Sequence, residues 1–241
     1  MSIKVFIGTD PKDTKAYGVL VDSILSNTKE QVEFIPLKDH ELRWKKYYWR
    51  SYRVDENGQM WDDRDGKPFS TAFSFTRFCA PMLNNYKDER VIFMDPDMMF
   101  RGDIGELMDW APNDKAISCV QHSHVPSEDH KMGGLLQTLY ARKNWSSLMV
   151  MNTAKCKLLN TYNVNNRPGS WLHALAFLPD EQIGSLPEAW NWLEGWSNPS
   201  IAPLNVHFTR GTPDMPKCED VAYADEWRVY ANQHHRLERV A

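Results

Sequence analysis

The sequence has no long apolar run and little net charge, and each absence excludes a class of protein. No stretch approaches the roughly 18 consecutive apolar residues of a membrane-spanning helix. The net charge is −4 over 241 residues, which argues against a dedicated nucleic-acid-binding protein. No signal peptide is expected, because Met1 to Lys4 lead directly into a strand-like run. What is present, 42% hydrophobic and 25% charged residues, is typical of a globular protein.

Cysteines are few and scattered. The four are Cys79, Cys119, Cys156 and Cys218, and no two of them form a C-x-x-C pair. This spacing favours reduced thiols over a disulfide framework or a zinc site. The sequence therefore predicts a cytoplasmic protein.

Strand and helix patterns alternate in the amino-terminal half and predict an α/β fold. Strand-like runs lie at residues 3–7, 32–35 and 91–94. Helical spacings lie between them at residues 16–27 and 72–86, the second after a cap at Ser70-Thr71. Short connections between such elements predict a parallel sheet with right-handed crossovers. Further strands are expected at 116–120, 148–151 and 206–208, and a last helix at 225–237. No repeat or linker divides the 241 residues, so we expect one domain.

The most informative feature is Asp95-Pro96-Asp97, which ends the apolar run Val91-Ile92-Phe93-Met94. Residues i and i+2 of an extended segment point the same way, so both carboxylates can face one cation. Pro96 lacks an N–H and stops the strand where the acids begin. Two carboxylates there suit a hard divalent ion that also holds phosphate oxygens. Gly8-Thr9-Asp10 follows the first strand in the same way, and the two strand ends together predict a nucleotide site.

Four ordered segments carry a family resemblance. They are Arg77 within Phe75-Thr76-Arg77-Phe78, then Asp95-Pro96-Asp97, then residues 177–182 followed by 186–191, and then 206–213. Their order and spacing resemble the helix arginine, the D-x-D motif, the acidic-Gln and "LP…WN" segments and the His-x-x-x-Gly segment of family-8-like GT-A glycosyltransferases. Segments such as Tyr48-Trp49-Arg50 and residues 142–147 are similar to those of bacterial and phage proteins of this type.

The resemblance implies a GT-A fold, a Rossmann-like open mixed α/β sheet flanked by helices in a single domain. Residues 1–120 would form the nucleotide-binding half and residues 121–241 the acceptor and sugar half. The implied enzyme is a hexosyl- or pentosyltransferase that moves a sugar from a UDP-sugar with retention of configuration. It would use Mn²⁺ or Mg²⁺, since a cation neutralises the charge that develops on the leaving diphosphate. A mixed set of oxygen and nitrogen ligands favours Mn²⁺.

The resemblance also implies roles for individual residues. His207 would be the third metal ligand beside Asp95 and Asp97, and its structural alternative is a strand histidine. Asp180 and Glu181 would accept sugar hydroxyls, and one of them would stabilise positive charge at the anomeric carbon. Arg77 would bind the phosphates or the sugar, and its alternative is a solvated helix residue. Further candidates for the donor are Thr9, Asp10, Tyr17, Ser146, Ser147, Arg210 and Lys217, while the other histidines are expected in loops or on the surface.

The acceptor is the least determined part of this interpretation. Residues 43–53 interleave five basic and five aromatic side chains, which can stack sugars or bases and bind phosphate, or can form an amphipathic flap over the donor pocket. Trp190, Trp192 and Trp196 form either a sugar platform or part of the core. We expect a glycan or small-molecule acceptor.

Other functions stay open from the sequence. One is a phage enzyme that glycosylates hydroxymethylated cytosine in duplex DNA in the host cytoplasm. Another is a non-catalytic nucleotide-sugar-binding protein. A metal-dependent phosphohydrolase is disfavoured, because the sequence offers no second cluster of carboxylate and histidine ligands beside Asp95 and Asp97.

Overall fold

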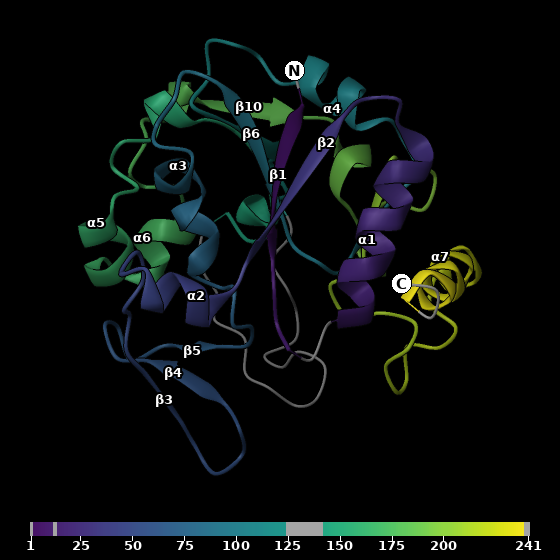
Figure 1. Ribbon diagram of the computed structural model, residues 1–241, viewed down its shortest axis with the longest axis horizontal. Helices are drawn as coiled ribbons and strands as arrows, with labels where there is room; N and C mark the ends of the chain where they lie inside the picture. Colours follow the sequence, from purple (N-terminus) through teal and green to yellow (C-terminus); the bar gives the residue numbers. More distant parts are fainter. Residues whose placement is uncertain (1, 12–13, 124–141, 239–241) are drawn as a thin grey trace.

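The computed structural model describes residues 2–11, 14–123 and 142–238, and every structural statement below refers to these residues. Their largest element is a six-stranded sheet of order β10-β8-β9-β6-β1-β2 (Figure 1). Its strands are β1 (Ile3–Gly8), β2 (Val32–Leu37), β6 (Arg90–Met94), β8 (Ile117–Val120), β9 (Leu148–Asn152) and β10 (Ile183–Leu186).

The sheet is mixed. β1 pairs in parallel with β2 and β6, and β8 pairs in parallel with β10. β9 lies antiparallel between β6 and β8, so β6, β8 and β10 all run the same way. The open mixed α/β sheet expected from the sequence is confirmed. No helix among the described residues is long and apolar enough to cross a membrane.

Both faces of the sheet are buried, because successive side chains of a strand point to opposite faces. Along β6, Val91 and Phe93 enter one hydrophobic cluster, while Ile92 and Met94 enter the other. The first cluster is covered by α3 (Ala80–Leu83), α5 (Thr161–Asn166) and α6 (Gly169–His173). The second is covered by α1 (Thr14–Asn27) and α4 (Ile104–Trp110), and the predicted last helix, α7 (Ala224–Glu238), packs against α1 (Figure 1).

The structure corrects the single helix expected over residues 72–86. The chain forms a turn, then the 3-10 helix η1 (Thr76–Cys79), then the short α3, and neither Ser70 nor Thr71 caps a helix start. Pro81 explains the break: it has no N–H to donate to the carbonyl of Arg77, but it is well suited to the first turn of a new helix. Gly8 is required beside this segment, since a Cβ there would lie 2.6 Å from Cγ of Phe73.

A three-stranded meander was not predicted from the sequence. It consists of β3 (Tyr52–Val54), β4 (Met60–Asp62) and β5 (Pro68–Phe69), and it follows α2 (Asp39–Trp44) at the lower left of Figure 1. Arg50 anchors it: its guanidinium bonds both carboxylate oxygens of Asp62 at 2.5 and 2.7 Å and lies 4.2 Å from the centre of the Phe75 ring.

A second small sheet has the order β11-β12-β7. β12 (Asn205–His207) is its middle strand, parallel to β11 (Trp192–Leu193) and antiparallel to β7 (Met98–Phe100). β7 begins directly after the Asp95-Pro96-Asp97 turn. This sheet therefore connects the carboxyl end of β6 to a segment far along the chain.

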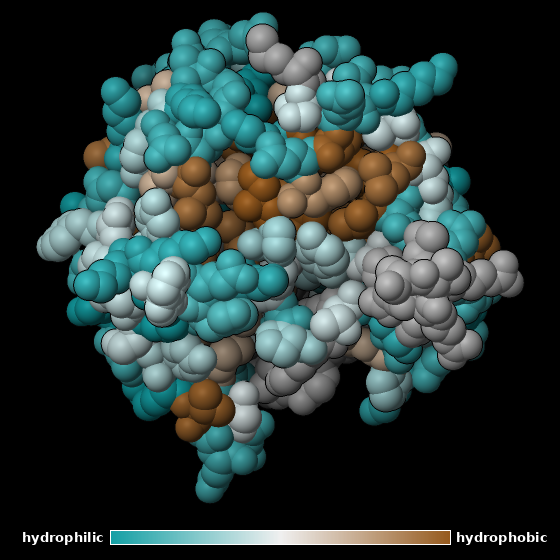
Figure 2. All heavy atoms as spheres, viewed as in Figure 1, coloured by the Kyte–Doolittle hydropathy of each residue, from teal (hydrophilic) through white to brown (hydrophobic). Residues whose placement is uncertain are grey.

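Hydrophobic surface gathers over β1, β2 and the space between β2 and α1 (Figure 2). β2 is the edge strand of the large sheet, so Val32, Phe34 and Ile35 are only half buried. Pro36 removes one donor N–H from this edge, and a proline on an edge strand limits pairing with other chains.

Asp62→Asn is expected to lower the free energy of unfolding by about 3 kcal/mol, because it leaves the buried charge of Arg50 without its counter-charge. Both side chains of this pair are 1% exposed. Asp63→Asn is the control: its partner Arg53 lies 3.4 Å away with a 62% exposed side chain, so the loss should stay below about 1 kcal/mol. Urea denaturation measures both, and equal losses would contradict this account of the anchor.

All four cysteines are free thiols, as the sequence predicts, and all four are buried. Burial raises the pKa of Cys79, Cys119 and Cys156 to about 12, and it also raises the pKa of Cys218. Unfolded thiols ionise near pH 9, so their burial stabilises the fold fully below that pH, and this contribution is lost as the pH rises toward 12. We expect DTNB at pH 8 to react slowly with native protein and rapidly with four thiols in denaturant; a fast-reacting native thiol would refute this.

Candidate active site

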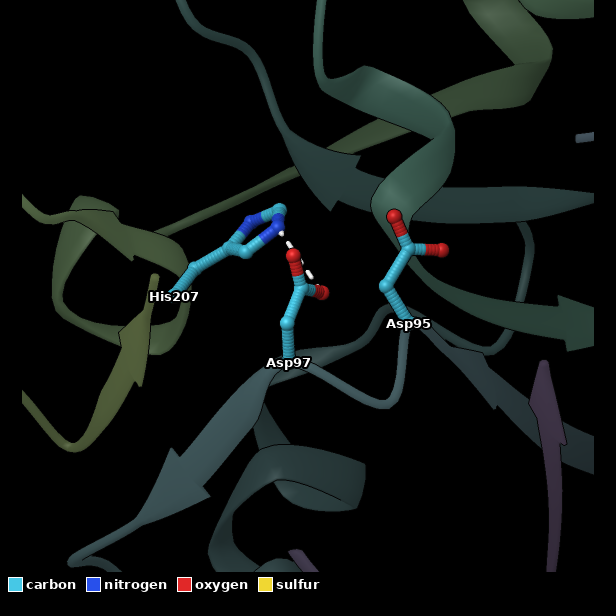
Figure 3. A group of neighbouring side chains, drawn as sticks. All are labelled: Asp95, Asp97 and His207. Carbon is cyan, nitrogen blue, oxygen red and sulfur yellow. Dashed lines mark ion pairs between the residues drawn. The ribbon is translucent and has the colours of Figure 1, made fainter. Parts of the chain in front are cut away.

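Three side chains converge where the two sheets meet. Asp95 follows β6, Asp97 precedes β7, and His207 ends β12. The β7–β12 register sets His207 opposite Met98, and the Phe208 N–H donates to the Asp97 carbonyl at 2.9 Å. Ligand atoms of Asp95, Asp97 and His207 all lie within 4.8 Å of one another (Figure 3).

The orientation of His207 is set by a hydrogen-bond chain behind it. Its Nδ1 lies 2.9 Å from Oδ1 of Asn191, which ends the 3-10 helix η6 (Glu188–Asn191). The Asn191 amide N–H donates to Oγ of Ser147, whose hydroxyl in turn donates to the Asn144 carbonyl. With Oδ1 as acceptor, Nδ1 carries a proton, and Nε2 is the ring nitrogen that a neutral imidazole would offer to a metal ion. Nε2 lies 3.4 Å from Oδ1 of Asp97.

This arrangement fits a divalent cation. Two electron-rich atoms 3.4 Å apart are stabilised by positive charge between them. Ligands on one ion with bonds of about 2.1 Å stand at most about 4.2 Å apart, so the outermost ligand atoms would have to move together by roughly half an ångström or more around an ion. Two carboxylates and one imidazole form a donor set that Mn²⁺ accepts.

Arg77 lies beneath the Asp95-Pro96-Asp97 turn and is buried. Its guanidinium contacts Oδ1 of Asp95 at 3.0 Å and donates to the Ser146 carbonyl at 2.9 Å. It also lies 5.1 Å from the centre of the Phe93 ring. The solvated helix residue considered as an alternative is therefore excluded. Arg77 is a structural partner of the first carboxylate and part of the cavity wall.

A cavity of about 210 Å³ opens beside the cluster. Of the residues proposed from the sequence, six line it: Arg77, Asp95, Asp97, Ser146, Ser147 and His207. Ser146 and Ser147 belong to the 3-10 helix η3 (Trp145–Ser147) that precedes β9. Residues 65–75 of the meander and the loop that follows it form another part of the wall.

Asp180 and Glu181 are not among the residues that line this cavity, and their expected role beside the sugar stays a prediction. They begin the 3-10 helix η5 (Asp180–Gln182) and immediately precede β10. β10 runs the same way as β6, so this segment is at the amino edge of the sheet, while Asp95 and Asp97 are at the carboxyl edge. The Asp180 carboxylate pairs with Arg142 at 2.6 Å, and its side chain is 82% exposed.

The remaining donor candidates do not line the cavity. Arg210 pairs with the buried Glu194 at 2.9 Å, and Lys217 is exposed with a φ of 70°. Thr9 donates to the Leu37 carbonyl at 2.9 Å, and Asp10 accepts the Ala72 N–H at 3.0 Å. These two residues therefore brace loops at the carboxyl edge. Burial against the core raises the pKa of Tyr17, the last of the set.

Sequence reasoning missed most of the cavity wall, including Asp65, Lys143 and His173. His173 was expected in a loop or on the surface, but it ends α6 half buried. Its Nδ1 lies 2.9 Å from Oγ of Ser146, and its ring packs edge-on against Phe78 at 5.2 Å. Of these, only Lys143 could have been found from the sequence, because it stands in the same short segment as the donor candidate Ser146. His124 and His130 lie outside the described residues.

The structure also places the tryptophans and the basic segment that were singled out in the sequence. Trp190 and Trp192 are buried core residues, and Trp196 is half buried beside a separate cavity of about 340 Å³. In residues 43–53, Arg43 is paired with Asp39 at 2.6 Å and Arg50 with Asp62. Lys45 also pairs with Glu41 at 3.8 Å and Arg53 with Asp63 at 3.4 Å, so four of the five basic side chains have acidic partners within the protein, which leaves less positive charge for a phosphate backbone.

Solved glycosyltransferases share this fold. The chain aligns with the bifunctional glycosyltransferase WbbM (TM-score 0.55, 13% identity, 95% of this chain and 49% of that one). It also aligns with the galactosyltransferase LgtC bound to donor and acceptor sugar analogs (TM-score 0.56, 10% identity, 96% of both chains). A third is mouse xyloside xylosyltransferase 1 (TM-score 0.53, 12% identity, 86% and 97%). This chain spans about half of WbbM, and at these identities the likeness shows a GT-A-like fold.

Sequence comparison adds a plant relative. No family model matches the chain. Protein CDI of Arabidopsis thaliana is 40% identical over 231 residues, which cover 93% of this chain and 84% of that protein. The bacterial or phage type expected from the sequence stays a prediction. At this identity and coverage, the chain belongs to the family of protein CDI.

Proposed function

We propose that this protein is a metal-dependent glycosyltransferase that moves a sugar from a UDP-sugar to an acceptor. The observation that carries the proposal is the group Asp95, Asp97 and His207, whose ligand atoms lie within 4.8 Å at the carboxyl edge of a GT-A-like sheet. Ligands of open α/β sheets bind at this edge. Galactosyl- and xylosyltransferases among the structural relatives leave both a hexose and a pentose as candidate sugars.

Asp95, Asp97 and His207 would hold Mn²⁺, or Mg²⁺ in its place. When bound, the ion supplies positive charge that stabilises the leaving nucleoside diphosphate. Asn191 keeps the lone pair of His207 Nε2 directed at the cluster, and Arg77 fixes the Asp95 carboxylate at 3.0 Å. Preorganised ligands of this kind avoid reorganisation when the donor enters.

The cavity beside the cluster would take the sugar. Arg77 and Lys143 add positive charge to its lining, and Ser146 and Ser147 add hydroxyl groups. Retention of configuration is proposed from the resemblance of the four sequence motifs. Asp180 and Glu181 stay candidates for the sugar hydroxyls: neither lines the cavity, but Asp180 pairs with Arg142, the neighbour of the cavity residue Lys143.

We propose a glycan or small molecule as the acceptor, in preference to duplex DNA. Arg43 and Arg50 of the basic segment are held by Asp39 and Asp62, and the net charge of the chain is −4. A DNA acceptor would require binding that weakens steeply with salt. The four buried thiols support a reducing compartment such as the cytoplasm as the place of reaction.

Binding of UDP should depend on Mn²⁺ and on Asp97. At 100 times its dissociation constant a ligand stabilises a protein by about 2.7 kcal/mol, which raises Tm by roughly 5–10 °C for a chain of this size. Thermal unfolding with UDP, with and without Mn²⁺, should show this shift in the native protein and lose most of it in Asp97→Asn. Asp114→Asn, an exposed carboxylate beside Lys115, is the control.

The same protein then serves the activity test. UDP release from UDP-glucose, UDP-galactose and UDP-xylose should require Mn²⁺ and should fall at least about a hundredfold in Asp97→Asn, the magnitude typical of a lost electrostatic group. Binding of UDP and Mn²⁺ without release or transfer from any donor would identify a non-catalytic nucleotide-sugar-binding protein instead. Absence of any UDP binding would refute the proposed donor.

Asn191→Leu should weaken Mn²⁺ binding about 10–100-fold, the usual cost of losing a partner that orients a metal-bound histidine. The matched control is Asn205→Leu, a buried asparagine on β12 whose amide bonds the Trp190 carbonyl and makes no contact with His207 Nδ1. Titration calorimetry with Mn²⁺ in the presence of UDP gives both affinities. Equal affinities in the two variants would show that Asn191 does not orient the ligand.

A further inference from the structure

The cavity contains one more carboxylate besides those of the metal cluster. Among the described lining residues this is Asp65, which lies in the turn between β4 and β5. Its Oδ2 accepts the Gly169 N–H at 2.7 Å, and its Oδ1 accepts the Lys67 N–H at 3.0 Å. A carboxylate has about four acceptor positions on its two oxygens, so these two donors leave others for a ligand, and the Asp62 carboxylate lies close beside that of Asp65. The two backbone donors fix the direction of the carboxylate.

Asp65 takes no part in the Arg50–Asp62 ion pair that anchors the meander. Arg50 forms its two-pronged ion pair with Asp62 and donates to the carbonyls of Val164 and Arg167 at 3.0 and 2.7 Å. Among the residues that the structure describes, Asp65 takes part in no ion pair. Burial raises the pKa of Asp62, and the nearby Asp65 carboxylate adds to the rise. Asp65 therefore brings a second carboxylate to this wall beside that of Asp62.

A chain of contacts along the cavity wall links Asp65 to the metal cluster. Asp65 bonds Gly169, the first residue of α6, and the last residue of α6, His173, lies 2.9 Å from Oγ of Ser146. The carbonyl of Ser146 accepts from Arg77, which contacts Asp95. The sequence of contacts runs from the turn of the meander, through α6 and η3, to the first metal ligand. Asp65 is therefore at the end of this chain farthest from the cluster.

The surroundings of Asp65 suit a sugar ring. Phe69 and Phe75 line the same cavity with their rings packed edge to face at 5.2 Å, and aromatic faces pack against the apolar face of a sugar. Ser70, Ser74 and Ser170 add hydroxyl groups. The volume of about 210 Å³ is below the roughly 300–1,000 Å³ of pockets for drug-sized ligands, so it fits a single ring better than a whole nucleotide sugar.

We propose that Asp65 binds a hydroxyl group of a sugar ring seated in this cavity, and that it is a specificity-determining residue of the enzyme. The inference rests on the proposed transferase function. A carboxylate that accepts from a sugar hydroxyl forms a charge-assisted hydrogen bond, and a site built to bond a hydroxyl discriminates strongly against sugars that lack it. The sugar can be that of the donor or that of the acceptor, and the experiment separates the two.

The test uses Asp65→Asn with a control for the structural role of a turn carboxylate. Asp55, in the other hairpin turn of the same meander, accepts the N–H groups of Asn57 and Gln59 at 2.9 and 3.0 Å and lies outside the cavity. Asp55→Asn therefore disturbs similar bonds in the same sheet without touching the proposed site. Both variants and the native protein are compared with Mn²⁺ present, after thermal unfolding confirms that all three fold.

Two measurements are made on each protein. Calorimetry gives the affinities for UDP and for UDP-glucose, UDP-galactose and UDP-xylose, and an assay of UDP release gives the stimulation by a panel of methyl glycosides. For Asp65→Asn we expect UDP affinity within twofold of native. If the donor sugar contacts Asp65, affinity for the UDP-sugar falls about tenfold or more. If the acceptor does, donor affinity holds and the stimulation by the methyl glycosides falls about tenfold.

The proposal is overturned if Asp65→Asn changes neither the donor affinity nor the stimulation. It is also overturned if Asp55→Asn produces the same losses, or if Asp65→Asn weakens UDP itself as much as the UDP-sugars, since either result shows an indirect structural effect. Failure of the native protein to bind UDP with Mn²⁺ refutes the proposed function, and it is seen before the variants are compared.

Discussion

The site depends on the antiparallel pairing of β12 with β7. Side chains alternate along a strand, so a slip of one residue would replace His207 by an apolar neighbour beside Asp97. The opposite face of the small sheet prevents the slip, because Val206 and Phe208 are fully buried against Met99 in a hydrophobic cluster. Ordinary apolar burial therefore fixes the register that a three-ligand metal site needs.

Two buried arginines fix the positions of the cavity walls. Arg77 joins the segment before α3 to the turn that bears Asp95, and Arg50 joins the meander to the body of the protein. Buried ion pairs of this kind add little net stability, because desolvation offsets most of the attraction. Their value here is geometric: each holds one wall of the cavity at a fixed place relative to the other. This is how a chain with short helices can present a defined pocket.

Local patterns predicted much of the fold and part of the site. Hydrophobic runs located β1, β2, β6, β8, β9 and β12, and the turn after β6 located Asp95 and Asp97. His207 came from the family resemblance, since its pairing partner is far away in sequence. The role of Asp180 at the sugar stays a prediction, because a motif shows that a segment exists and not at which edge of the sheet it lies. Asp65 and His173 depend on how the meander and α6 pack, which no local pattern encodes.

The position of β12 has a consequence during protein synthesis. Asp95 and Asp97 precede His207 by a large part of the chain, and ribosomes add about 5–20 residues per second, so the third ligand follows the first two by roughly 5–20 s. Until β12 pairs with β7, a nascent chain offers a cation only two adjacent carboxylates. In the proposed metal site, capture of an ion by all three ligands would therefore have to wait until β12 has paired with β7.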